Sequence, residues 1–204
     1  VGTLTISHGR AATDPSKRAT GRPRRSITWP RPGAPSYSTV TVPGAINAWE
    51  TLLKAHGTKG LDELLQPAIR MAADGWPVHS KVSHDWAATE GKLRKNGSHA
   101  FLPGGSAPKP GDRFINAGLA ETLRAIARHG AKGFYEGPVA ADIVATLRER
   151  GGLHTEEDFA AGLGGANFVE PITIDWNGHT VHQIPPNGQG ILVLMMLGML
   201  ERLG

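Results

Sequence analysis

The segment from Glu170 to Leu200 constrains the fold more than any other part of this chain. It reads EPITIDWNGHTVHQIPPNGQGILVLMMLGML. Apolar residues alternate with polar ones over residues 172–176, which is the period of a β-strand. The following Asn177-Gly178 suits a type I′ turn, because both central residues of that turn need a positive φ. The pattern therefore predicts a β-hairpin with its return strand over residues 180–184.

The residues after the hairpin predict a sharp turn and a helix. Pro185-Pro186 end the return strand, since neither proline can donate a ladder hydrogen bond. A short glycine loop follows, and residues 191–203 read as a helix that is apolar almost all round. Such a helix is buried or lies in a membrane, and this one is shorter than the roughly 20 residues that a span needs. We therefore expect a buried helix packed against the hairpin.

Upstream of the hairpin, most of the sequence from residue 40 onward reads as helix. Apolar residues recur at helical spacing in runs bounded by glycine or proline. Pro67 falls inside the second run and is expected to kink or divide it, and Thr155-x-x-Asp158 resembles a capping box. The fold class is therefore α+β, mostly helical with a C-terminal β-hairpin. The expected helices cover residues 45–56, 61–73, 80–95, 116–129, 138–150 and 155–161, and a strand is expected within residues 1–7.

Residues 1–38 and 39–204 differ in composition, and we expect a division between them. The first region is a basic loop region, rich in proline and arginine, with no periodicity beyond the possible leading strand. Its seven basic residues are opposed only by Asp14, and they account for the net charge of +4. Almost no aromatic residues accompany them and no nucleic-acid motif is present. We therefore expect no nucleic-acid partner, and the folded domain to lie within residues 39–204.

Composition also limits the chemistry. The chain has no cysteine, which excludes disulfides, thiolate metal sites and a cysteine nucleophile. No signal peptide or membrane span is visible, so no membrane partner is expected. The chain begins with Val1. The sequence leaves the compartment open: periplasmic or secreted if an upstream signal peptide has been removed, otherwise cytoplasmic.

A histidine pair and a glycine loop could suggest a metal or cofactor site, but neither has the required spacing. His179 and His182 are three apart on a predicted strand, so they point to opposite faces and do not form a metal pair. Gly188-x-Gly190 stands between a strand and a helix, but the third glycine of a dinucleotide fingerprint is absent. The glycines are better explained by a sharp turn into the helix. The sequence therefore predicts no metal site.

Several motifs, taken together and in order, resemble the γ-glutamyltranspeptidase family of N-terminal nucleophile hydrolases. The NGQG spelling is close to a branch of that family described as acyltransferases, and the match corresponds to part of the large subunit. The motifs are Thr41-Val-Pro-Gly-Ala45 with Trp49, Gln66-Pro-Ala-Ile69 with Ala72-Ala-Asp-Gly75, Gly133-Phe-Tyr-Glu-Gly137, Gly151-Gly-Leu153 with Thr155 and Asp158, and Val169-Glu-Pro-Ile172 with Ile184-Pro-Pro-Asn-Gly-Gln-Gly190.

The resemblance implies an αββα sandwich, of which this chain would be a fragment, and a defined chemistry. Members of the family are precursors that cleave themselves into a large and a small subunit. The new N-terminal threonine of the small subunit attacks a γ-glutamyl amide, with its own α-amino group as base. No metal or organic cofactor is needed. The implied partners are the small subunit and a glutathione-like γ-glutamyl substrate, and no catalytic residue is assigned within this chain, which stops before that threonine.

One substrate-binding residue is implied by the resemblance. Arg10 occupies the place of the family arginine that pairs with the substrate α-carboxylate, a task that suits the planar guanidinium fork. A second interpretation is that Arg10 is one more arginine of a basic loop. Asn187 and Gln189 are weaker candidates, which would shape a loop near the active cleft.

Two alternatives to a γ-glutamyl enzyme remain open. The chain can belong to an acylase of the same family that acts on other amides, as cephalosporin acylases do. It can also be a catalytically incomplete fragment or a non-catalytic partner, because the threonine region is missing from it.

Overall fold

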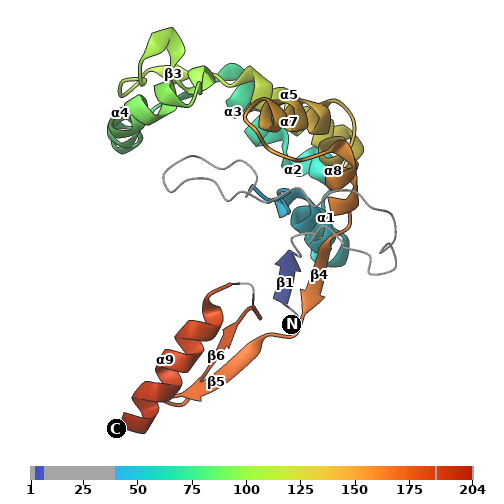
Figure 1. Cartoon of the computed structure of the whole chain (residues 1–204), viewed down its shortest axis with the longest axis vertical. Helices are drawn as coiled ribbons and strands as arrows, with labels where there is room; N and C mark the ends of the chain where they lie inside the picture. The colour runs from blue at the N-terminus through green and yellow to red at the C-terminus, as the bar shows by residue number, and fades with distance from the viewer. Residues whose placement is uncertain (1–2, 7–39, 187, 204) are drawn as a thin grey trace, which may run out of the picture. The chain divides into compact units, whose positions relative to one another are not determined.

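The computed structural model describes residues 3–6, 40–186 and 188–203 (Figure 1). The chain divides into two compact units. One comprises Thr58–Val139, and the other comprises Val1–Gly57 together with Ala140–Gly204. The architecture is α+β and mostly helical, which confirms the predicted class. The division expected between residues 38 and 39 falls at the edge of the described residues and stays a prediction.

The continuous unit is built around helix α5 (Ala117–His129). Helices α2 (Leu61–Leu64), α3 (Gln66–Asp74) and α6 (Lys132–Tyr135) all pack against α5. Ala120, Leu123 and Ile126 form its buried stripe, at the three-to-four-residue spacing of one helix face. Pro67 stands in the first turn of α3, so it divides the predicted second helix in two, as expected.

The same unit has an aromatic cluster beside a short β-pair. Strands β2 (Trp76–Pro77) and β3 (Arg113–Phe114) pair antiparallel. Helix α4 (Ser80–Lys95) and the 3-10 turns η3 (His99–Phe101) and η4 (Pro103–Gly105) lie between them in sequence. The Trp86 ring lies 4.7 Å from the Phe114 ring, edge to face. The buried Ser83 hydroxyl donates to the Pro108 carbonyl (2.8 Å), which ties α4 to the loop before β3.

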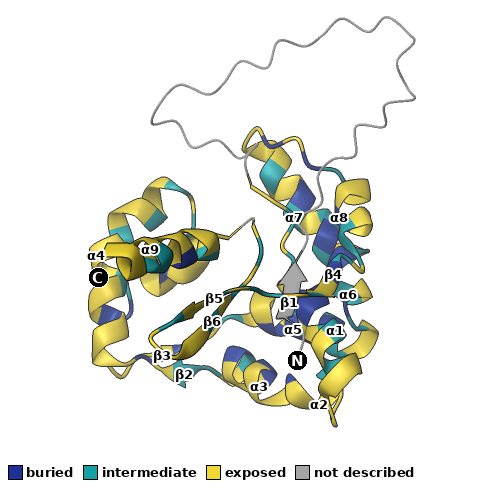
Figure 2. Cartoon of the chain, turned by 90° about the horizontal axis from the view of Figure 1, so that it is seen from below, coloured by how far each residue is buried: buried dark blue, intermediate teal, exposed yellow. Residues whose placement is uncertain are grey.

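The other unit contains a second β-pair covered by a helix. Strand β1 (Thr3–Ile6) runs antiparallel to β4 (Ala166–Val169), with Ile6 opposite Ala166, and α1 (Ala45–His56) packs on both strands. Helix α7 (Pro138–Glu149) and helix α8 (Glu156–Gly162) carry buried faces (Figure 2). Thr155 and Asp158 form the predicted capping box at the start of α8. The leading strand is thus confirmed, whereas β4 is an element that the sequence pattern does not predict.

The predicted hairpin is present, with the predicted turn. Strands β5 (Ile172–Trp176) and β6 (His179–Gln183) pair in register from Ile172 opposite Gln183 to Trp176 opposite His179. Asn177 and Gly178 have φ values of 48° and 76°. These two positive values are the ones that a type I′ turn requires, so the prediction is confirmed.

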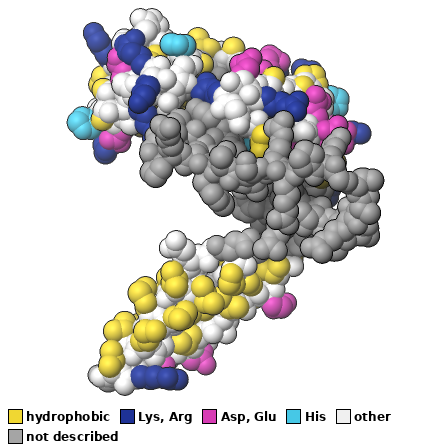
Figure 3. Space-filling view, in the orientation of Figure 1, with side chains coloured by type: hydrophobic (Ala, Val, Ile, Leu, Met, Phe, Trp, Pro, Cys, Tyr) yellow, Lys and Arg dark blue, Asp and Glu magenta, His cyan; other side chains and the backbone are white. Residues whose placement is uncertain are grey.

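Helix α9 (Gly190–Leu203) packs on the hairpin as predicted, but the prediction that it is buried is wrong for this chain. Leu194 is buried, at 7% exposure, whereas Met196, Met199 and Leu200 are each at least 56% exposed. The physical reason is that β5 and β6 cover one side of a helix that is apolar on every side. Figure 3 shows hydrophobic side chains gathered over the surface that includes this helix.

Within the described ranges, no helix combines the length and the apolar character needed to cross a bilayer.

Candidate functional site

The structure describes one of the three candidate site residues, of which Arg10 is predicted to bind substrate and Asn187 and Gln189 are predicted to shape a loop near the active cleft. Gln189 is exposed in the turn before α9, where its backbone carbonyl accepts a hydrogen bond from the Leu192 backbone N–H (2.9 Å). Arg10 and Asn187 lie outside the described residues. The substrate-binding role of Arg10 and the loop-shaping roles of Asn187 and Gln189 therefore stay predictions.

The glycine at the start of α9 is explained by packing. A Cβ atom added to Gly190 would lie 2.9 Å from the Cβ and 2.5 Å from the Oε1 of Gln183. The first turn of α9 therefore lies directly against the end of β6, with no room for a side chain. This close contact explains why residue 190 is a glycine, and no phosphate ligand is needed to explain it.

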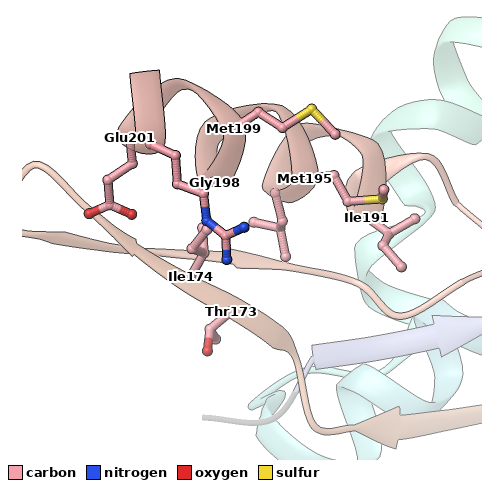
Figure 4. Close-up of a pocket in the computed structure, with 9 residues that line it drawn as sticks. Thr173, Ile174, Ile191, Met195, Gly198, Met199 and Glu201 are labelled. Carbon is pink, nitrogen blue, oxygen red and sulfur yellow. The ribbon is translucent and has the colours of Figure 1, made fainter. Parts of the chain in front are cut away.

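A shallow groove of about 440 Å³ runs along α9 beside β5. Figure 4 shows Met195, Met199 and Ile191 on the helix side and Ile174 on the strand side, with Gly198 close to Ile174. A Cβ atom on Gly198 would lie 3.0 Å from the Ile174 Cδ1, so this glycine lets the helix lie close to the strand. The lining also includes Thr173, Glu201 and Arg202. Its thioether and alkyl groups suit contact with apolar protein surface.

The hairpin has a second face, which carries Thr173 and Asp175, and this face is polar. Thr173 stands opposite His182, and Asp175 stands opposite Thr180. The Thr180 hydroxyl donates to the Asp175 carboxylate (2.6 Å). Across the described part of the chain, no group of three or more metal-ligating side chains comes together.

Buried polar side chains tie distant segments of the discontinuous unit together. Asn47, 4% exposed, donates from Nδ2 to the Gly162 carbonyl and accepts at Oδ1 from the Gly164 backbone N–H (3.0 Å). Gly162 is the last residue of α8, and Gly164 lies in the connection from α8 to β4. A buried amide with both of its functions satisfied fixes its partners, because leaving them unpaired costs about 1–3 kcal/mol per group.

His154 forms a second such tie. The ring is 9% exposed, and its Nε2 lies 2.6 Å from the Val40 carbonyl oxygen. Since a carbonyl oxygen only accepts, Nε2 carries the proton and donates it. Among the residues that the structure describes, none hydrogen-bonds the buried Nδ1 atom. The contact joins the residue that follows the GGL segment to the residue that precedes the Thr41–Ala45 segment.

Three carboxylates, the exposed Asp85 and Glu157 and the half-buried Glu90, have lowered pKa values with structural causes. The Ala107 backbone N–H, followed by the Arg94 guanidinium, lowers the pKa of Glu90. A hydrogen bond from Lys81 lowers the pKa of Asp85, and the backbone N–H of Glu157 with the Thr155 hydroxyl lowers the pKa of Glu157. Each carboxylate is ionised and holds a helix end, a loop or a neighbouring turn. None of the three has the raised pKa that a general acid working near neutral pH needs.

The described residues thus assemble supporting elements: a helix-covered hairpin, a helix-covered strand pair and polar ties between motif segments. A comparison with known proteins identifies what they support. Residues 26–204 match the family model of γ-glutamyltranspeptidase. The chain belongs to the γ-glutamyltranspeptidase family. The match confirms the resemblance found in the motifs. This family consists of enzymes.

Named relatives give the same result. The glutathione hydrolase-like YwrD proenzyme of Bacillus subtilis (strain 168) is 37% identical over 166 residues, which are 80% of this chain and 31% of that protein. The crystal structure of a cephalosporin acylase from Bacillus halodurans has a TM-score of 0.72 and 39% identity, covering 78% of this chain and 31% of that chain. The Helicobacter pylori γ-glutamyltranspeptidase structure has a TM-score of 0.73 and 26% identity, covering 93% of this chain and 58% of that chain.

The chain therefore spans about a third of the length of the curated relatives that it matches. The motifs that carry the family resemblance are placed by the structure at element starts and turns. The VPGA segment enters α1, the GGL segment leads into α8, and the Pro-Pro-x-Gly-Gln-Gly segment joins β6 to α9.

Asn47 and His154 are the two residues of this region that sequence reasoning missed. An asparagine within a helix pattern is read as part of the solvent-facing side. The partners of Asn47 and His154 are more than 110 residues away in sequence. No local sequence pattern indicates hydrogen bonds between residues so far apart, although Asn47 and His154 lie close to the VPGA and GGL motifs.

Proposed function

We propose that this chain is part of the large-subunit region of a γ-glutamyl transferase or hydrolase acting on glutathione-like amides. The observation that carries the proposal is the family match over residues 26–204. The words "glutathione hydrolase" and "proenzyme" in the names of relatives support the substrate class and the precursor form.

The reaction that we propose is acyl transfer through a threonine outside this chain. The hydroxyl oxygen of an N-terminal threonine attacks the γ-glutamyl carbonyl, while the α-amino group of the same residue takes the hydroxyl proton. The amide C–N bond then breaks, and the leaving amine takes up a proton. The resulting γ-glutamyl ester is released by water or by an acceptor amino acid. Under this proposal, Arg10 binds the α-carboxylate of the γ-glutamyl group.

The apolar surface of α9 supports a proposal about the partner. Contiguous exposed apolar surface of this kind marks an interface, and it lies on a helix whose opposite side already packs on β5 and β6. We propose that the small subunit covers this helix. A helix layer on a two-stranded sheet is also the kind of pairing from which an αββα sandwich is built. That architecture, and the separation of residues 1–38 from the domain of residues 39–204, belong to the same proposal.

A second candidate function is an acylase that acts on other amides. The observation that favours it is the 39% identity with the cephalosporin acylase structure. The two candidates share the nucleophile and differ in the acyl group, so only substrate comparison separates them.

Self-cleavage of the precursor is the experiment that tests the proposed function. We expect the full-length gene product to convert into two fragments after purification, and N-terminal sequencing of the smaller one to begin with threonine. Replacement of that threonine with alanine should leave the precursor intact, because the attacking hydroxyl is removed. A wild-type product that stays a single chain on prolonged incubation would contradict the proposal.

A further inference from the structure

Helix α4 carries a groove to which the proposed reaction assigns no residue. The groove has a volume of about 420 Å³, a size typical of sites for small molecules. It lies within the continuous unit Thr58–Val139, between α4 and the 3-10 turn η3. The side chains that line it are Val82, Asp85, Trp86, Thr89, Leu93 and Phe101.

Two aromatic rings of the lining are supported from behind by a third. The Trp86 and Phe101 ring centroids lie 6.4 Å apart. Each ring also packs on the Phe114 ring, at 4.7 Å from Trp86 and 6.4 Å from Phe101. Phe114 is buried, whereas Phe101 is 43% exposed. The buried ring therefore fixes the two rings that reach the groove.

Polar contacts fasten the loop that carries Phe101 to α4. Glu90 accepts hydrogen bonds from the Ala107 backbone N–H (2.9 Å) and from the Arg94 guanidinium. Arg94 also donates to the Gly105 carbonyl. The groove is therefore preformed, so a ligand does not have to order this loop when it binds.

Asp85 gives the groove a negative charge, and among the described residues that line it this is the one carboxylate. The hydrogen bond from Lys81 lowers the pKa of Asp85, so the carboxylate is ionised at neutral pH. The side chains of Lys81 and Asp85 are 71% and 58% exposed. Exposed ion pairs contribute little to stability, so a bound cation can share or replace Lys81 at small cost.

We propose that this groove binds a small quaternary ammonium compound. The faces of aromatic rings attract a cation that lies within about 6 Å of the ring centroid. Centroids that are 6.4 Å apart allow one cation to lie within that distance of both Trp86 and Phe101. The ionised Asp85 adds a Coulombic attraction on the same side of α4.

The lining favours a quaternary ammonium over a primary one. A primary ammonium has three N–H donors that need acceptors. The Thr89 hydroxyl is already hydrogen-bonded to the Asp85 and Trp86 backbone carbonyls of its own helix. A quaternary ammonium has no N–H to satisfy, and its methyl groups can pack on Val82 and Leu93.

Two ligands of the same shape test the proposal. Choline and 3,3-dimethylbutan-1-ol differ in having a positive nitrogen or a neutral carbon at the branched centre. The dissociation constants of both are measured by NMR titration of the full-length protein at low salt. We expect choline to bind at least about fivefold more tightly than the alcohol, because the rings and the carboxylate attract the charge alone.

Variants assign this preference to the groove. Phe101→Leu keeps apolar bulk and loses the ring, and Asp85→Asn keeps the shape and loses the charge. Each should weaken choline binding at least about threefold and leave the alcohol within about twofold. Lys81→Ala should strengthen choline binding, since it frees Asp85. The matched control is Phe168→Leu, which removes a partly exposed ring outside the groove and should change neither constant.

Three outcomes overturn the proposal. Equal affinity for choline and the alcohol would show an apolar groove that does not recognise charge, and no binding of either would show that the groove is not a site for such ligands. Choline binding that survives unchanged in Asp85→Asn and Phe101→Leu would lie elsewhere on the protein. Asp85→Asn alters an exposed side chain, so it decides the matter if Phe101→Leu disturbs the loop. None of these results depends on the γ-glutamyl activity.

Discussion

Replacing Arg10 with alanine is expected to lower kcat/KM for a γ-glutamyl anilide by at least about 100-fold in the full-length enzyme. A charge-assisted bidentate pair contributes about 1.5–3 kcal/mol per hydrogen bond, and each 1.4 kcal/mol corresponds to a factor of ten. The loss should appear mostly in KM, because the α-carboxylate is bound equally before and during the reaction. Steady-state kinetics of the purified variant measures the effect.

The matched control for Arg10→Ala is Arg18→Ala, a second arginine of the same basic segment. If Arg10 is the residue that binds the α-carboxylate, Arg18→Ala changes kcat/KM by less than about threefold, since no substrate contact is assigned to Arg18. An Arg10→Ala enzyme with undiminished activity on γ-glutamyl anilide would favour the acylase candidate.

Replacing Gly133 with alanine is expected to destabilise the protein by about 3 kcal/mol. Gly133 lies in α6, where it packs on α5, and an added Cβ would lie 2.7 Å from the Ala125 carbonyl carbon and closer still to the attached oxygen. The obstacle is backbone within a helix and cannot rotate away as a flexible side chain does. Relief requires that α6 move away from α5, and overpacking of this kind costs about 1–3 kcal/mol or more. The shift of the urea unfolding midpoint measures it.

Gly91→Ala is the matched control for Gly133→Ala. Gly91 lies in the interior of α4, and nothing comes within 4 Å of its added Cβ. Because alanine is favoured over glycine within a helix by about 1 kcal/mol, this variant should be slightly more stable than wild type. Equal stability of the two variants would show that α6 does not lie as close to α5 as described.

The parts of the fold that were predicted correctly are those with local causes. The Asn177-Gly178 turn, the Thr155–Asp158 capping box and the division at Pro67 each depend on residues within one turn of the chain. Strand β4 was missed because its partner is β1, more than 150 residues earlier. Pairing over such a distance is decided by packing, and the local pattern of Ala166–Val169 does not indicate it.

The burial of α9 was predicted wrongly for a related reason. An apolar pattern on all sides indicates that a helix needs cover, but it does not indicate which segment provides the cover. Within the described residues, β5 and β6 cover one side of α9. The candidate site follows the same rule: motif residues could be recognised one by one, whereas the ties from Asn47 and His154 depend on long-range contacts.

The most direct test of the proposed γ-glutamyl activity is release of a chromogenic amine from a γ-glutamyl anilide by the full-length, self-cleaved enzyme. We predict release that depends on the N-terminal threonine and rises when an acceptor dipeptide is added, because the acceptor competes with water for the γ-glutamyl ester. A self-cleaved enzyme that hydrolyses other acyl anilides but leaves the γ-glutamyl anilide untouched would contradict the proposed activity.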